Sequence, residues 1–120
     1  MRWFVTNRNI EDGGFGAEFS DVTYWTLKSP ELPVDVLASW NQETLDTFKG
    51  KLVAVANQFP HPAGTATEDQ KHVCLFIHGY NVKWTDAMHT YDNVAKKIFD
   101  GTDGLGELIS FDWPSKGSLP

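Results

Sequence analysis

An apolar run at residues 73–77 constrains the fold of this chain more than any other stretch. The run is too short for a core helix and is rich in strand-forming residues, which favours a parallel strand buried on both faces. It ends abruptly at the tetrapeptide His78-Gly79-Tyr80-Asn81, and a helical pattern begins shortly afterwards. Ligands of open α/β sheets bind at the carboxyl ends of strands, so this turn is the first candidate for chemistry.

A helix and a second strand are expected after this turn. Apolar residues recur at helical spacing over residues 84–99, a stripe typical of core packing. Asp86 suits the positive end of the helix dipole, and Gly101 offers a left-handed residue at the helix end. Residues 108–111 form another short apolar strand. Strand, helix and strand in this order predict a βαβ crossover with parallel strands.

The first half of the chain predicts two strands joined by a hairpin connection. Residues 3–6 and 22–27 are rich in aromatic and β-branched residues, and the Gly-rich run 11–16 lies between them. That run lacks the G-x-G-x-x-G spacing and a following Gly-Lys-Ser/Thr, so it is not a phosphate loop. With the βαβ unit, these elements indicate an α/β chain with a mixed sheet.

A further helix is predicted between the two halves. Residues 41–59 carry apolar side chains at three-to-four spacing, and Ser39 or Asn41 could cap the helix start. Residues 52–56 would also fit a strand, although the helix is the preferred interpretation. A polar loop, 61–70, then leads to the apolar strand.

Composition limits the partners and the location that we expect. The chain has 120 residues, 41% of them hydrophobic, which suits one domain with a single core. A net charge of -6 repels phosphate backbones, so no nucleic-acid partner is expected. No segment resembles a signal peptide or a membrane span, and the single cysteine, Cys74, suits a reducing compartment. A cytoplasmic location is therefore expected.

Metal and thiol chemistry have weak support in the sequence. The histidines show neither H-x-x-x-H nor H-E-x-x-H spacing. They are His61, His72, His78 and His89. Residues 100–107 lack the alternating acids of an EF-hand loop, and Cys74 lies inside an apolar strand, where it is expected to be inert. No metal and no cofactor are expected.

The turn at residues 78–81 places main-chain N–H groups between a strand end and a helix start. Such groups can stabilise an anion or a developing oxyanion, and Gly79 would allow the close approach and unusual φ that this requires. The competing interpretation is a tight turn with a buried histidine that bonds neighbouring carbonyl groups. Spacing alone leaves both interpretations open.

The motifs H-G-Y-N at residues 78–81 and W-P-S at residues 113–115 resemble an uncharacterised branch of the α/β-hydrolase superfamily. Its pattern is a hydrophobic strand, H-G-Y-N, a helix, a second strand and W-P-S. The opening residues 4–8 are similar to that family's start more loosely. The resemblance implies a partial α/β-hydrolase fold, a mixed sheet with a parallel βαβ unit. The unit comprises strand 73–77, helix 84–99 and strand 108–111, the strands being the third and fourth of the hydrolase sheet.

Carried over by position, the resemblance gives the turn a catalytic role. The Tyr80 main-chain N–H would be one oxyanion-hole donor, Gly79 would allow the turn, and His78 would brace the loop rather than act as the base. The superfamily's nucleophile sits on a G-x-S-x-G elbow, with acid and histidine later in the chain. None is visible up to Pro120. The resemblance therefore implies that residues 1–120 are the N-terminal part of a single serine-hydrolase domain acting on small acyl substrates.

Ser115 imitates half of such an elbow, because it follows a strand and precedes Gly117 by two residues. However, the elbow needs a small residue where Trp113 stands, and Pro114 adjoins the serine. A place in a turn or at the rim of a substrate cleft is the preferred interpretation of Ser115, and a nucleophilic role is the alternative. No nucleophile is otherwise expected in this chain.

The chain alone is expected to be inactive, and a second class of function stays open. The alternative is a small non-catalytic α/β module that binds a ligand or a partner, since hydrolase folds also host non-enzymatic roles. In the family's strand order the third strand lies between the fourth and the fifth. One edge of residues 73–77 would then be unpaired, and self-association of the chain is expected.

Overall fold

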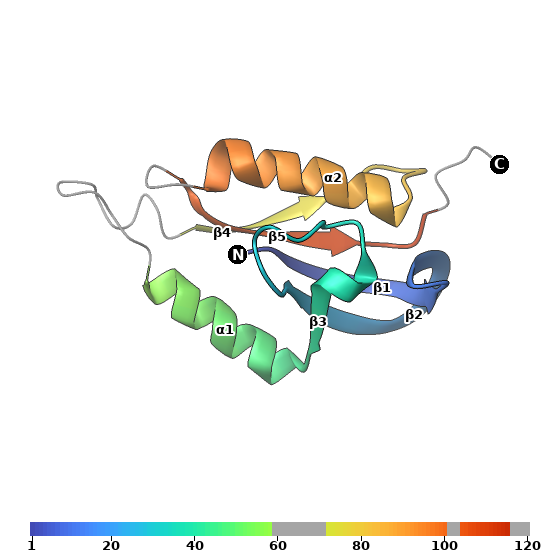
Figure 1. Cartoon of the computed structure of the whole chain (residues 1–120), viewed down its shortest axis with the longest axis horizontal. Helices are drawn as coiled ribbons and strands as arrows, with labels where there is room; N and C mark the ends of the chain where they lie inside the picture. The colour runs from blue at the N-terminus through green and yellow to red at the C-terminus, as the bar shows by residue number, and fades with distance from the viewer. Residues whose placement is uncertain (59–71, 101–103, 116–120) are drawn as a thin grey trace.

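The computed structural model describes residues 1–58, 72–100 and 104–115. In this part of the chain a five-stranded sheet lies between two helices, with α2 (Trp84–Val94) on one face and α1 (Leu45–Asn57) on the other (Figure 1). The strands are β1 (Trp3–Glu11), β2 (Gly14–Leu27), β3 (Trp40–Glu43), β4 (His72–Ile77) and β5 (Gly106–Asp112). Their order in the sheet is β3-β2-β1-β5-β4. Parallel and antiparallel pairs coexist, which confirms the α/β class and the mixed sheet.

The crossover that the sequence predicts is present. β4 pairs in parallel with β5 along its whole length, and α2 connects the two strands. After α2 the chain continues helically through η3 (Ala95–Phe99), a wider π-type turn in which the Asp100 N–H bonds the Ala95 carbonyl at 2.9 Å. The helix expected over residues 84–99 is confirmed. Gly101, which was expected to end it, lies outside the described residues.

β1 and β2 form one hairpin that is longer than the predicted strands 3–6 and 22–27. At its tip Asp12 and Gly13 have φ values of 50° and 74°. Positive φ at both central residues is what a two-residue hairpin turn needs to match the twist of its strands. The Gly-rich run is therefore a tight turn with paired residues on both sides, rather than a flexible connection.

The helix predicted over residues 41–59 begins later, at Leu45. The residues before it belong to β3, which pairs antiparallel with β2. Thr44 caps the helix in place of Ser39 or Asn41, because its hydroxyl accepts a 3.1 Å hydrogen bond from an N–H of the first turn. β3 was missed because so short a strand carries too little alternation to be recognised.

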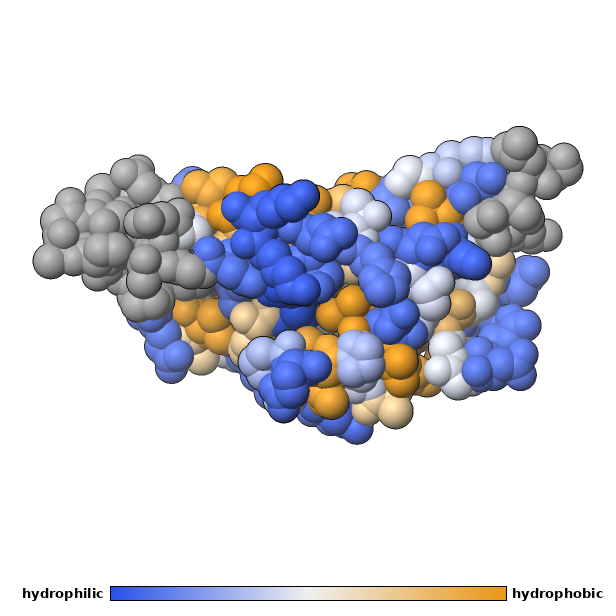
Figure 2. All heavy atoms as spheres, turned by 45° about the horizontal axis from the view of Figure 1, so that its top comes forward, coloured by the Kyte–Doolittle hydropathy of each residue, from blue (hydrophilic) through white to orange (hydrophobic). Residues whose placement is uncertain are grey.

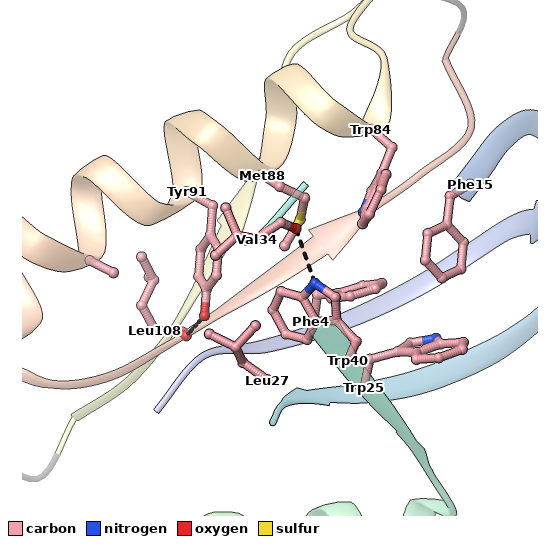
Figure 3. Packing of buried hydrophobic residues seen from close by; sticks show 11 residues of the cluster. Phe4, Phe15, Trp25, Leu27, Val34, Trp40, Trp84, Met88, Tyr91 and Leu108 are labelled. Atoms are coloured by element: carbon pink, nitrogen blue, oxygen red, sulfur yellow. Dashed lines mark hydrogen bonds between the residues drawn. The ribbon is translucent and has the colours of Figure 1, made fainter. Parts of the chain in front are cut away.

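The main core lies between α2 and the sheet (Figure 3). Its buried residues are Phe4, Phe15, Trp25, Leu27, Val34, Trp40, Trp84, Met88, Tyr91, Ala95 and Leu108. Two of its polar groups are paired: the Tyr91 hydroxyl donates to the Leu108 carbonyl at 2.6 Å, and the Trp40 indole donates to the Val34 carbonyl at 3.0 Å. The Trp84 indole N–H is buried without a partner among the described residues. The apolar stripe of the long helix is thus core packing, as its spacing predicts.

The opposite face of the sheet is only partly covered. There α1 packs its buried Phe48 against Trp3 of β1 and Ile109 of β5. The rings of Phe48 and Trp3 meet edge to face, with centroids 5.4 Å apart. Because these contacts involve the middle of the sheet, α1 leaves β4 uncovered.

β4 lies at the edge of the described sheet, and one of its faces is exposed. The prediction that its residues are buried on both faces is therefore wrong. Among the described strands, its hydrogen-bonded neighbour is β5 alone. Cys74 and Phe76 pack against the core beneath α2. The alternate side chains of Val73, Leu75 and Ile77 point to the other face and are 48%, 64% and 61% exposed.

Hydrophilic side chains gather over α2 on the surface shown in Figure 2. His89 of α2 is exposed, and its ring lies 2.9 Å from the Asp35 carboxylate of the segment before β3. An amphipathic helix with one buried and one hydrophilic side is what the sequence pattern predicts. In the part of the chain that is described, no helix is long and apolar enough to cross a bilayer.

Candidate functional site

The turn after β4 lies at the carboxyl edge of the parallel strands, where β5 also ends (Figure 1). Its left-handed residue is Asn81, with φ of 65°. Gly79 does not have a positive φ, so the unusual φ expected there is wrong. Asn tolerates the left-handed region better than most side chains do. A Cβ on Gly79 would meet no atom within 4 Å, so the space beside the turn is open.

Tyr80 extends from this turn into solvent, with 70% of the residue exposed. Within residues 1–58, 72–100 and 104–115, no hydrogen bond occupies its main-chain N–H. By contrast, the N–H of Val82, two residues later, donates to the Ser115 hydroxyl at 2.8 Å. The turn therefore presents an N–H donor at the sheet edge next to one that is already used.

His78 is buried, and both of its ring nitrogens face acceptors. Nδ1 lies 2.7 Å from the Gly79 carbonyl oxygen, and Nε2 lies 3.0 Å from both Asp112 Oδ1 and the Trp113 carbonyl oxygen. These oxygens can only accept, so both ring nitrogens are placed to donate to them.

The surroundings of His78 favour its charged form. Burial by itself lowers the pKa of His78, but the bonds to Asp112, Gly79 and Trp113 outweigh this and raise that pKa above its ordinary value. A ring that holds both protons has no lone pair with which to remove one from a substrate. The arrangement is suited to holding the turn rather than to general-base chemistry.

The two sequence motifs pack directly against each other. The Trp113 ring stacks on the His78 ring, with centroids 4.9 Å apart and planes 9° from parallel. The Trp113 indole also donates to the His78 carbonyl at 3.1 Å. Ser115 is 8% exposed, and its described hydrogen bonds join it to Val82 and Arg8, with no histidine among these partners. The bond from the Val82 N–H gives the Ser115 hydroxyl a structural partner.

Sequence reasoning missed Arg8, which completes this cluster from β1. Its guanidinium Nε lies 2.7 Å from Asp112 Oδ1, and both side chains are almost fully buried. Two sequence signals include it: Arg8 ends the opening stretch 4–8 that loosely resembles the family's start, and counting by two from the buried Phe4 and Thr6 puts it on the core-facing side of its strand. Polar neighbours obscured that alternation.

Hollows lie at both ends of the sheet. One of about 380 Å³ is lined by Arg8, Lys83 and Ser115 among others, beside the turn. Another of about 870 Å³ lies at the amino-terminal end of β1, around Arg2 and Asp92. Arg2 is already paired there, at 2.8 Å from Asp92. The smaller hollow is the one that adjoins the candidate chemistry.

The remaining residues considered from the sequence are dispersed. His72 and His89 are exposed, Cys74 is half-buried, and His61 lies outside the described residues. Across the described ranges, no group of three or more His, Cys, Asp or Glu residues could hold a metal ion. Asp100, at the start of the Gly-rich segment, bonds the Arg2 guanidinium.

A parallel βαβ unit in a mixed sheet, with a turn at the carboxyl edge of its strands, is a partial α/β fold. A family model described as "Alpha/beta hydrolase of unknown function (DUF900)" matches residues 60–120, just over half of the chain. The chain belongs to this family. The matched range contains both the H-G-Y-N and the W-P-S motifs. Comparison with curated proteins found no match, and neither did comparison with solved structures.

Proposed function

We propose that this chain is the amino-terminal half of a serine hydrolase domain that cleaves esters or related acyl compounds. In this proposal the Tyr80 main-chain N–H is one donor of the oxyanion hole. The observation that carries it is the N–H of Tyr80, unoccupied in the described chain and placed at the sheet edge of an α/β-hydrolase family member. Preorganised N–H donors at such a point stabilise a developing oxyanion.

The neighbours of Tyr80 have supporting roles. His78 braces the turn because its ring bonds the Gly79 carbonyl and the Asp112 carboxylate and stacks on Trp113. Gly79 leaves the approach to the N–H open, because the space where a side chain would begin is empty. The substrate's carbonyl oxygen would enter from this open side.

The nucleophile, the acid and the catalytic histidine are proposed to come from outside residues 1–120. One edge of β4 has no partner among the described strands, which supports this, as do the exposed side chains of Val73, Leu75 and Ile77. A further strand beside β4 and a helix over these side chains would cover them. In hydrolase folds the G-x-S-x-G elbow lies at such a strand-to-helix turn. The 120-residue chain alone would then be inactive and would associate through this apolar surface.

A serine-directed fluorophosphonate probe tests the proposal on a longer protein that contains the expected elbow. We expect labelling of the elbow serine, none after its replacement by alanine, and none on residues 1–120. A folded longer protein that the probe does not label would overturn the hydrolase proposal. In that case the non-catalytic binding module would be the better account.

A further inference from the structure

We propose that Arg8 is the positioning residue of the turn: its guanidinium fixes the H-G-Y-N segment against the sheet and thereby aims the Tyr80 N–H. The effect of Arg8 on catalysis rests on the proposed function. The role of Arg8 in holding the turn does not depend on that function.

The Arg8 guanidinium is surrounded by acceptors from separate segments. Nε donates to Asp112 Oδ1 of β5 at 2.7 Å, and Nη2 donates to the Val82 carbonyl of the turn at 2.8 Å. Nη1 donates to the Ser115 carbonyl at 2.8 Å and to the Gly16 carbonyl of β2 at 3.1 Å. Arg8 is 2% exposed. A planar fork can reach these directions at once, which the single ammonium of lysine cannot.

The main chain around Arg8 is anchored as well. Its N–H donates to the Thr6 hydroxyl at 3.0 Å, and that hydroxyl donates to the Asp112 carbonyl at 2.7 Å. The pairing of β1 with β2 changes register on both sides of Arg8. Such irregularities commonly redirect a side chain near a functional site. Arg8 thus projects from a fixed base.

The turn is held on both sides of Tyr80. Before it, the His78 ring bonds the Gly79 carbonyl. After it, Val82 is held twice, by Arg8 through its carbonyl and by Ser115 through its N–H. The Gly79 carbonyl and the Tyr80 N–H belong to one peptide unit, so the first contact orients that N–H directly, and the Val82 contacts hold the chain two residues later. Loss of the Arg8 contact would release the later side.

Arg8 also determines the charge balance at the turn. The guanidinium and the His78 ring share Asp112, and Arg8 Nη2 lies 3.5 Å from His78 Nε2. Two groups that only donate cannot bond each other, so the carboxylate between them holds the pair together. Removing Arg8 would therefore disturb the His78 brace in addition to the Val82 contact.

The test compares R8K with R2K in a longer protein that contains the proposed nucleophile. Arg2 is a matched control because it directly precedes the same strand and pairs with two carboxylates, but at the opposite end of the sheet. In R8K we expect amide exchange of Tyr80 and Val82 to quicken about 10-fold or more, as for a locally opened segment. We expect kcat to fall about 10- to 100-fold, as for a misplaced donor. KM should stay within about twofold.

R2K should leave turn exchange and kcat at their wild-type values. Wild-type exchange at Tyr80 and Val82 in folded R8K would overturn the positioning role, whatever the activity. If amide exchange quickens in R8K but the wild type itself hydrolyses no substrate, the positioning role stands and the proposed function is refuted. If R8K does not fold, the wild type decides through the NMR coupling between Arg8 Nη2 and the Val82 carbonyl carbon. We expect that coupling to be observed, and its absence alongside rapidly exchanging guanidinium protons would contradict the proposal.

Discussion

The hydroxyl oxygen of Ser115 accepts a 2.8 Å hydrogen bond from the main-chain N–H of Val82. This bond joins the loop after β5 to the turn after β4, which are far apart in the sequence. Two motifs that look separate along the chain are therefore one structural unit. Ser115 has a structural partner there, and no hydrogen bond to a base is found for its hydroxyl in the described chain.

Replacing Ser115 by alanine is expected to destabilise the fold by about 1–3 kcal/mol, because the Val82 N–H loses its partner. Urea unfolding of S115A measures this loss. Ser110 offers a matched control, since its hydroxyl is buried without a partner among the described residues. S110A should change stability by less than about 0.5 kcal/mol. Equal effects of the two substitutions would contradict the role assigned to Ser115.

The stability of the chain is expected to fall as the pH rises past the ordinary histidine range. The pKa of His78 is raised in the folded state, so the folded chain binds this proton more tightly than the unfolded chain. Its contribution is complete below the unfolded value of about 6.5 and is lost as the pH rises through the folded pKa. Asp112 and Arg8 are the charged groups that face the ring. Unfolding free energies measured across this range in wild type and H78Q test the sign.

In H78Q the decline should be smaller, and the variant should lose about 1.5–3 kcal/mol at low pH, where the charged hydrogen bonds are complete. H89Q is the control, because His89 is a surface residue whose pair with Asp35 contributes little. It should keep the wild-type decline. A wild type and H78Q with parallel pH profiles would show that the ring is not held in its charged form.

The Tyr91 hydroxyl bridges two strands inside the core. It accepts from the Trp3 N–H at 2.9 Å and donates to the Leu108 carbonyl at 2.6 Å (Figure 3 shows the second bond). Y91F should therefore lower the free energy of unfolding by about 1–3 kcal/mol, since both groups lose a buried partner. Y24F is the matched change, because the Tyr24 ring packs on Phe48 without a hydroxyl bond in the described chain. Comparable denaturation midpoints for the two variants would refute this prediction.

Residues 1–120 alone are expected to self-associate through β4. For the wild type, light scattering should show an average mass that rises with protein concentration. L75K should suppress this, because a lysine on an edge strand opposes pairing with another strand. V53K is the control, because it adds the same charge to an apolar residue of α1 that is 59% exposed. Self-association should persist in V53K. A monodisperse wild-type monomer would count against association through this edge.

The strongest local patterns of the sequence correctly predicted the second half of the fold. The stripe at residues 84–99 and the apolar strands on either side of it identify the parallel crossover without any knowledge of distant contacts. Helical periodicity persists over several turns here, so it outweighs local ambiguity. The H-G-Y-N and W-P-S motifs pointed to the hydrolase family, which the family match confirms.

Other features were wrong or missed because they depend on partners far along the chain. The helix start moved from residue 41 to Leu45 because β2 supplies an edge that converts Trp40–Glu43 into a strand. Gly79 was expected to take the unusual φ, but Asn81 takes it. Which residue of the turn takes the positive φ depends on the hydrogen bonds between the turn and the sheet. Local composition does not predict those bonds.

The sequence by itself determined the class of fold, the crossover and the two motifs, because periodicity and short-range composition are properties of contiguous residues. Only the tertiary structure decided that Arg8 is buried and that both ring nitrogens of His78 face acceptors. Both findings follow from where acceptors of other segments lie. Such relations arise only when β1, β4 and β5 are brought together.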